Sequence, residues 1–218
     1  GQNELLEAIS GEDPRAPAAS VRIDGHDAGG TGVARRRARG LAFVPEERLG
    51  RAAVPTLGLH LNTLLTTAAA PLVRRGLIDA RATVAHAARI IAQYDVRGAG
   101  PRAPAQSLSG GNLQKFVVGR ELIKSPAVLV LAQPTWGVDV GAAARIRAEL
   151  VALRDAGAAV LVVSEELDEL FEVCDALHVI ANGRLSPRIA IGDASVERIG
   201  ELMGGAAAPA AAATAGAA

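Results

Sequence analysis

Short apolar runs alternate with helical patterns in the second half of the chain. Residues 127–132 and 158–163 are apolar runs of strand length, and residues 142–156 between them have a helical pattern. A further helix is expected from Glu165, followed by a strand at residues 176–181. Strands and helices that alternate in this way predict an α/β fold with helices packed on a mostly parallel sheet.

The first half of the chain contains fewer strand patterns. Residues 2–10 are expected to form a helix that ends at Gly11, and residues 41–45 a buried strand that ends at its proline. From about residue 57 to residue 125 the pattern is helical. This block between two strand-bearing parts predicts a helical lobe inserted into the α/β core.

One helix of the predicted lobe has a start signal and an apolar face. Asp79 can cap its N-terminus, because an aspartate side chain accepts a hydrogen bond from the first free backbone amides. Val84, Ala87, Ala88 and Ile91 follow at helical spacing. They predict one apolar stripe that faces the rest of the lobe.

The composition changes this picture little. Half of the 218 residues are apolar and only 2% are aromatic, so aliphatic side chains must build the core. The formal net charge is zero, which argues against broad nucleic-acid binding, since that needs a basic surface. Arg35, Arg36, Arg37 and Arg39 form a local basic cluster. We interpret it as a solvated helix face rather than a phosphate-binding patch.

Cysteine and histidine usage predicts a reducing compartment and no metal site. Cys174 is the only cysteine, so an intramolecular disulfide is excluded. The histidines lack metal-ligand spacing; they are His26, His60, His86 and His178. No apolar stretch reaches the roughly 20 residues of a membrane-spanning helix, and no secretory signal is present. The chain begins at Gly1 rather than at methionine, so we expect a fragment or a trimmed product.

The strongest motif is LSGGNLQK at residues 108–115. Ser109, Gly110 and Gly111 are expected to open a helix whose N-terminal amides and positive dipole end favour an anion. The apolar positions expected to face inward are Leu113, Phe116 and Val117. An apolar strand and then PTWGVDVG follow the helix, which makes this more than an ordinary Ser-Gly helix start.

In this order of motifs the sequence resembles the ABC ATPases, whose LSGGQ-like signature precedes the Walker B strand. The resemblance covers residues 1–188 and is strongest to the second ATP-binding half of the tandem ATPases of sugar and nucleoside importers. The shared segments besides the signature are VPEERLGR at 44–51, GVDVGA at 137–142 and the SEEL-DE pattern at 164–169. AQPT in place of DEPT favours the nucleoside branch.

The resemblance implies a P-loop core that lacks its first strands. Residues 1–205 would form the ATP-binding domain, with the helical subdomain at about 57–125, and residues 206–218 a low-complexity, disordered tail. Gly1, Gln2 and Asn3 would be the end of a Walker A loop that is truncated in this chain. Gln2 then stands where the phosphate-binding lysine is expected, and Asn3 where the Mg²⁺-binding hydroxyl is expected.

The other Walker-side positions of the family also carry unexpected residues. Ala132 and Gln133 replace the Walker B Asp-Glu pair, whose carboxylates hold Mg²⁺ and position water. Glu165 occupies the position of the switch histidine, and Glu46 that of the Q-loop glutamine. Together these departures predict a degenerate site that does not hydrolyse ATP by itself and has no metal ligands of its own.

The residues that the family uses on a partner's nucleotide are retained. In ABC proteins two ATP-binding domains meet head to tail, and each ATP lies between the Walker motifs of one and the signature of the other. Ser109, Gly110, Gly111 and Asn112 would act on ATP of the partner half, with Asp139 of the D-loop communicating across the dimer. ATP and Mg²⁺ are therefore the implied cofactors, mainly at this composite site.

The implied function is ATP-driven import of nucleosides or sugars from the cytoplasmic face of the membrane. The implied partners are another ATP-binding half or subunit, membrane permease subunits and, indirectly, a solute-binding protein, but no nucleic acid. Two alternatives stay open: a soluble ABC protein of translation or repair, and a truncated, non-functional remnant. Trp136 stands where the family usually has arginine, and we expect it to serve packing or a domain contact.

Overall fold

The computed structural model describes residues 1–67, 71–98 and 100–204. The expected disordered tail, residues 206–218, lies outside the described residues. None of the helices in the described ranges is both long and apolar enough to span a membrane.

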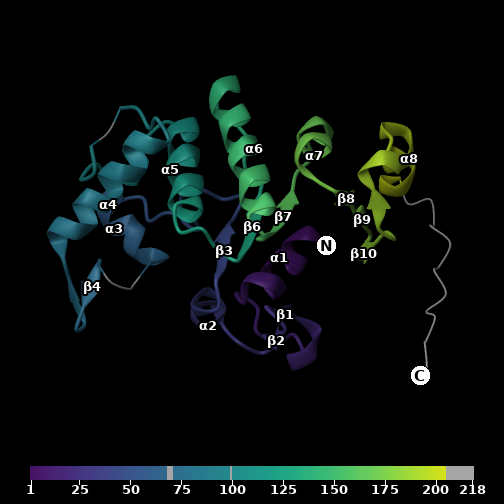
Figure 1. The fold of residues 1–218 in the computed structure, drawn as a ribbon, viewed down its shortest axis with the longest axis horizontal. Coiled ribbons are helices and arrows are strands. Elements are labelled where there is room, and N and C mark those ends of the chain that lie inside the picture. The colour runs from purple at the N-terminus through teal and green to yellow at the C-terminus, as the bar shows by residue number, and fades with distance from the viewer. Residues whose placement is uncertain (68–70, 99, 205–218) are drawn as a thin grey trace.

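A parallel sheet lies at the centre of the molecule (Figure 1). Within the described ranges it contains β3 (Leu41–Val44), β6 (Val128–Ala132) and β7 (Ala159–Val163), in the order β3-β6-β7. Both neighbouring pairs are parallel, so the predicted strands at 41–45, 127–132 and 158–163 and their parallel arrangement are confirmed. The carboxyl ends of these strands therefore meet at one edge of the sheet.

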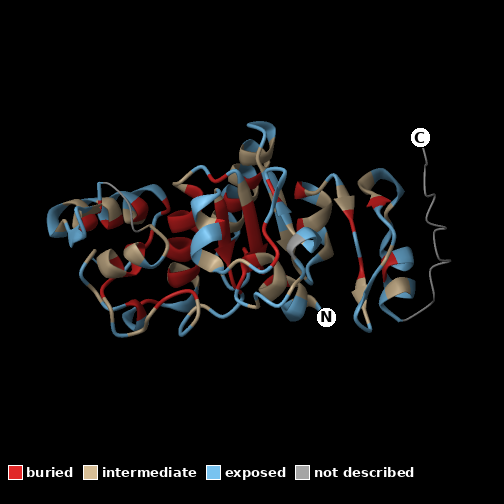
Figure 2. Ribbon diagram, turned by 90° about the horizontal axis from the view of Figure 1, so that it is seen from below, coloured by how far each residue is buried: buried red, intermediate tan, exposed pale blue. Residues whose placement is uncertain are grey.

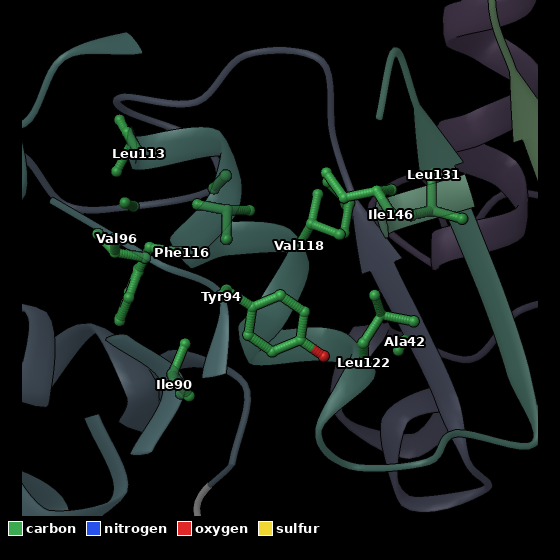
Figure 3. Close-up of a cluster of buried hydrophobic side chains, with 14 of the residues drawn as sticks. Ala42, Ile90, Tyr94, Val96, Leu113, Phe116, Val118, Leu122, Leu131 and Ile146 are labelled. Carbon is green, nitrogen blue, oxygen red and sulfur yellow. The ribbon is translucent and has the colours of Figure 1, made fainter. Parts of the chain in front are cut away.

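Alternate residues of the strands face different layers, because successive side chains of a strand point to opposite faces. The face toward α1 (Gln2–Ser10) carries Leu41, Phe43, Val130 and Ala132, which pack with Leu6 and Ile23. The other face carries Ala42, Val44, Leu129 and Leu131, which pack with the helices α4 (Ala80–Gln93), α5 (Gly110–Leu122) and α6 (Val140–Asp155). Figure 3 shows side chains of this larger cluster, and Figure 2 shows buried residues concentrated along the middle of the molecule.

The predicted N-terminal helix is confirmed as α1, which ends where Gly11 adopts a left-handed conformation with φ 87°. The short helix α2 (Val33–Ala38) contains Arg35, Arg36 and Arg37. It lies near the C-terminal end of α1, which Arg36 contacts. The interpretation of this cluster as a solvated face is wrong for Arg36, which is fully buried. Its Nη1 donates to the carbonyls of Ala8 and Ile9 at the end of α1, which offsets part of the cost of burial, whereas Nη2 has no hydrogen-bond partner within the described residues.

The other clustered arginines lie nearer the surface. Arg35 and Arg39 are exposed, as expected for a solvated face. Arg37 is only partly exposed, and its guanidinium pairs with the buried carboxylate of Glu121 at 3.4 Å. The cluster therefore anchors α2 to its neighbours as well as facing water.

The region 57–125 contains helices and one hairpin. Its helical elements are α3 (Leu59–Asn62), η2 (Thr63–Leu65), α4 (Ala80–Gln93), η3 (Ala105–Ser107) and α5 (Gly110–Leu122). A two-stranded antiparallel hairpin of β4 (Val73–Arg74) and β5 (Leu77–Ile78) interrupts them. A purely helical block is therefore the wrong description here. The turn at Arg75 and Gly76 has φ of 51° and 79°.

Helix α4 begins as predicted, since the Asp79 side chain accepts a hydrogen bond from the Ala82 amide at 2.9 Å. Its buried face differs from the predicted stripe. Thr83, Ala87 and Ile90 are buried, whereas Ala88 is exposed. The hydroxyl of Thr83 donates to the Asp79 carbonyl, which lets this polar residue face the interior.

The chain continues through α6 (Val140–Asp155) and α7 (Leu167–Val173), close to the predicted helices. The single strand expected at 176–181 is wrong. β8 (Ala176–Leu177) pairs with β11 (Ile189–Ala190), and β9 (Ile180–Ala181) pairs with β10 (Arg184–Leu185). The remaining elements are η1 (Ala18–Ser20), β1 (Arg22–Ile23), β2 (His26–Asp27), η4 (Ile191–Asp193) and α8 (Val196–Met203).

Candidate functional site

The start of α5 is the centre of the candidate site. Ser109 is its N-cap, and the Ser109 hydroxyl accepts hydrogen bonds from the backbone amide and the side-chain amide of Asn112, at 3.4 and 2.9 Å. The side-chain oxygen of Asn112 in turn accepts from the backbone amide of Arg97 at 2.8 Å. Ser109 and Gly110 are exposed. The positive end of a 13-residue helix therefore opens at the protein surface, where an anion is favoured.

Two glycines join this helix start to the loop after β6. A Cβ on Gly111 would lie 2.6 Å from the carbonyl oxygen of Gly137, so no larger residue fits without displacing backbone. Gly137 itself has φ of 68°, a conformation that suits glycine. The signature motif and the D-loop, residues 137–142, therefore pack backbone against backbone.

Asp139 fixes the beginning of α6 on the same surface. One carboxylate oxygen accepts from the Ala142 amide at 2.9 Å, which caps α6, and the other lies 2.8 Å from the Lys115 ammonium. The hydrogen bond from Lys115, followed by that from Ala142, lowers the pKa of Asp139 below its ordinary value. Lys115 is nearly buried, so the pair ties the second turn of α5 to the D-loop.

A second polar link runs through Gln114, which is almost fully buried. Its side-chain amide donates to the carbonyls of Gln133 and Pro134 at 3.1 and 2.9 Å. Its carbonyl oxygen accepts from Nε of Arg48 at 3.0 Å. Gln114 thus connects the end of β6, the signature helix and the loop after β3.

The strand β6 ends at Ala132, and Gln133 follows it. Ala132 is buried, and Gln133 is nearly buried with a positive φ of 49°. The side-chain oxygen Oε1 of Gln133 accepts from the Ser164 hydroxyl at 3.4 Å and from the Glu165 backbone amide at 3.5 Å. The structure thus brings Gln133 and Glu165 together, as their adjacent strands require. This donor set does not suit Mg²⁺, which prefers carboxylate and water oxygens.

No group of three acidic, cysteine or histidine side chains that could hold a metal ion occurs within the described ranges. Glu46 is exposed in the loop that follows β3. Gly1 lies at the start of α1 against Ile180 of β9 and Gly183, and its ammonium pairs with Glu4 at 3.5 Å. Gln2 and Asn3 form the first turn of α1.

The contacts of Arg48, Gln114 and Lys115 could not be assigned from the sequence, although all three lie in the quoted motifs. In the structure residues 113–122 of α5 are all buried, although several are polar or charged. Buried polar side chains require partners. No local pattern in the sequence identifies this burial or the partners, which lie in loops 19 to 66 residues away.

Sequence comparison finds relatives of this chain among import ATP-binding proteins. The nucleoside import ATP-binding protein NupA of Lactococcus lactis is 35% identical over 206 residues, 94% of this chain and 40% of its own length. The xylose import ATP-binding protein XylG of Burkholderia ambifaria is 41% identical over 85% of this chain and 36% of its own length. The guanosine import ATP-binding protein NupO of Bacillus subtilis is 32% identical over 94% and 40%. The chain therefore spans about two fifths of the length of these relatives.

Solved structures share the fold. An ATP-binding subunit of an ABC transporter aligns with a TM-score of 0.72 and 18% identity, over 94% of this chain and 83% of that one. The ATP-binding cassette MJ0796, solved as a dimer in a post-hydrolysis state with ADP and Pi, aligns with a TM-score of 0.68 and 17% identity, over 88% and 81%. No protein-family model matched the sequence. The chain has the P-loop fold of the ABC ATPases and is an ABC-type ATP-binding domain of the sugar and nucleoside importer type.

Proposed function

We propose that this chain acts as one ATP-binding half of an importer for nucleosides or sugars, at the cytoplasmic face of the membrane. Its partners are another ATP-binding domain, permease subunits and, indirectly, a solute-binding protein. Several relatives that resemble most of the chain are named as import ATP-binding proteins, which supports transport over a role in translation or repair.

The proposed contribution is made in trans, to ATP held mainly by the partner domain. The observation that carries it is the exposed start of α5, where Ser109 and Gly110 open a positive helix end beside the D-loop. The positive helix end and the exposed Ser109 hydroxyl suit the phosphates of ATP. Transfer of a phosphoryl group depends mostly on positioning and electrostatics, so such donors raise the partner's turnover.

The chain's own Walker face contributes little to hydrolysis in this proposal. Ala132 offers no ligand for Mg²⁺, and the Gln133 amide cannot act as a general base. Gln2 lacks the charge of a phosphate-binding lysine. We therefore expect the chain alone to show no Mg²⁺-dependent ATP hydrolysis above background.

The test compares ATP hydrolysis by the assembled transporter with changes on the two faces. Ser109→Arg fills the signature surface and should lower the rate by about 100-fold or more, the size of effect seen when one transition-state donor is lost. Ser107→Arg is the matched control, since Ser107 is also exposed and lies two residues earlier, in η3. Gln133→Glu should change the rate by less than about twofold, because one carboxylate does not restore the metal or lysine positions.

The outcome that contradicts the proposal is the reverse pattern. If Ser109→Arg and Ser107→Arg both leave hydrolysis intact while Gln133→Glu changes it strongly, this half performs the chemistry in its own site. Loss of hydrolysis in both serine variants would show a general disturbance of the lobe and would also contradict a role specific to Ser109.

A further inference from the structure

We propose that Arg48 is a positioning residue of the composite nucleotide site. Its guanidinium would hold the start of the signature helix and the D-loop turn in one arrangement. This inference rests on the proposed function, because it concerns how the signature surface is held for the partner's ATP. Arg48 belongs to the VPEERLGR segment, to which the functional argument has so far assigned no role.

The backbone around Arg48 is held rigidly enough to carry such a role. The loop after β3 closes on itself through three hydrogen bonds: Ala52 to Glu47 at 3.1 Å, Ala53 to Arg48 at 2.8 Å and Gly50 to Ala53 at 2.9 Å. Ala52 and Ala53 are buried in the core cluster that also contains residues of α5. The Cα of Arg48 is therefore fixed relative to the signature helix.

The Arg48 side chain spans the two segments that it would position. Nε donates to the Gln114 side chain of α5 at 3.0 Å, and Nη2 donates to the backbone carbonyl of Trp136 just before the D-loop. The guanidinium also lies over the Trp136 ring, 5.9 Å from the ring centroid. A planar, forked donor can make these contacts together, whereas a single ammonium group cannot.

The third guanidinium nitrogen lies beside the glycines of the site. A Cβ on Gly110 would be 3.0 Å from Nη1, and a Cβ on Gly137 would be 3.5 Å from it. Gly110 belongs to the signature and Gly137 to the turn whose carbonyl touches Gly111. Loss of the Arg48 guanidinium would open space at this junction and let the two segments shift apart. Displacements of about 1 Å in a reacting site can cost about 100-fold in rate.

Arg48 also leaves a positive charge at this junction. Lys115 and Arg51 pair with carboxylates, whereas no carboxylate within the described ranges forms a salt bridge with Arg48. Partial burial lowers the pKa of Arg48, but an arginine remains protonated at neutral pH. Its charge adds to the positive end of α5 on the surface that would meet an anionic ligand.

The test measures steady-state ATP hydrolysis against ATP concentration in the assembled transporter carrying Arg48→Gln, Arg48→Lys or Arg51→Gln. Arg48→Gln should lower kcat by about tenfold or more and leave KM for ATP within about twofold, because the lost arrangement matters during phosphoryl transfer. Arg48→Lys should be similarly impaired, since it keeps the charge but loses the fork. Arg51→Gln is the control: Arg51 lies three residues later and pairs with Glu7 and Glu12.

Trp136 supplies a second readout, because it is the only tryptophan of the chain and about half exposed. Its fluorescence emission should shift in both Arg48 variants and stay unchanged in Arg51→Gln. The inference is overturned if Arg48→Gln keeps the wild-type kcat, or if Arg48→Lys restores kcat fully. Should Arg48→Gln fail to fold, the milder Arg48→Lys decides by the same two measurements.

Ser109→Arg, measured in parallel, separates this inference from the proposed function. Loss of hydrolysis in Ser109→Arg but not in the Arg48 variants overturns the positioning role alone. Wild-type hydrolysis in Ser109→Arg overturns the proposed function, and the positioning role falls with it.

Discussion

The guanidinium of Arg36 is buried and donates hydrogen bonds to backbone carbonyls at the C-terminal end of α1. The last carbonyls of α1 lack partners within the helix, and Arg36 donates to two of them as well as to the Thr31 carbonyl at 2.9 Å. A positive charge at a helix C-terminus also interacts favourably with the helix dipole. Sequence patterning could not separate Arg36 from Arg35, because its partners lie 27 and 28 residues earlier.

We expect Arg36→Met to lower the free energy of unfolding by about 3 kcal/mol, because it leaves buried carbonyls without donors. Arg35→Met should change it by less than about 0.5 kcal/mol, since Arg35 is exposed on the same helix. Urea denaturation followed by circular dichroism measures both. Equal effects of the two substitutions would mean that the buried hydrogen bonds of Arg36 contribute nothing specific.

At the scale of elements, α5 is anchored at its far end by a buried ion cluster. Glu121 is fully buried and contacts Arg120 at 2.9 Å, Arg37 of α2 at 3.4 Å and Lys124. Arg120 also donates to the carbonyls of Ala52 and Asn62 at 2.9 and 3.1 Å. The cluster thus joins the signature helix to α2, to the loop of Arg48 and to α3.

Glu121→Gln should lower the free energy of unfolding by about 3–5 kcal/mol at neutral pH, because it leaves buried cations without a counter-charge. Burial opposes ionisation of Glu121, but the neighbouring cations outweigh it and lower its pKa below the ordinary 4.5. Its stabilisation is therefore present above the unfolded pKa and lost as pH falls through the lower folded pKa.

Unfolding measured between pH 7 and pH 3 should show a steeper acid loss in the wild type than in Glu121→Gln. Asp155→Asn, which removes an exposed partner of Arg154, is the control and should cost less than about 1 kcal/mol. An unchanged pH dependence in Glu121→Gln would count against an ionised Glu121 in the folded state.

Element types could be predicted where one local pattern decides them. The central strands are short apolar runs, and helix α4 begins at a side-chain cap, so both were found. The buried face of α4 differs from the predicted one because the Thr83 hydroxyl donates a hydrogen bond to the Asp79 carbonyl, so Thr83 can be buried. The pattern of residues 176–181 predicts one strand, but the run divides where the Val179 amide donates to the Ser186 side chain rather than to a neighbouring strand.

In the whole molecule and its candidate site, too, features set by neighbouring residues could be predicted, whereas contacts between distant segments could not. The signature helix start and the strand–helix order follow from local residues, and the structure places Ser109 at the N-cap as predicted. The links that join the motifs, through Arg48 and Gln114, depend on long-range packing and have no local signal. The hairpin β4–β5 has no such signal either, because its two-residue strands are too short to form an apolar or alternating run.

That hairpin also provides the surface for a prediction about the assembled transporter. Leu77 and Ile78 of β5 are 75% and 56% exposed, and Leu65 of η2 is 46% exposed. Exposed apolar side chains are available for contact with another protein. The family resemblance implies that the helical lobe meets the permease, so we expect this hairpin to contact a membrane subunit. The hairpin and the β9–β10 hairpin lie at opposite ends of the molecule (Figure 1).

Crosslinking from a single placed cysteine tests this contact. Cys174→Ser removes the only native cysteine, and Leu77→Cys or Leu185→Cys then carries a photoactivatable thiol reagent in membranes containing the cognate permease. The two leucines are matched, because both are exposed in two-residue strands of hairpins, and Leu185 is 53% exposed in β10. We expect a permease adduct from position 77 and none from position 185. Adducts from 185 alone, or none from 65, 77 and 78, would place the permease contact on another surface.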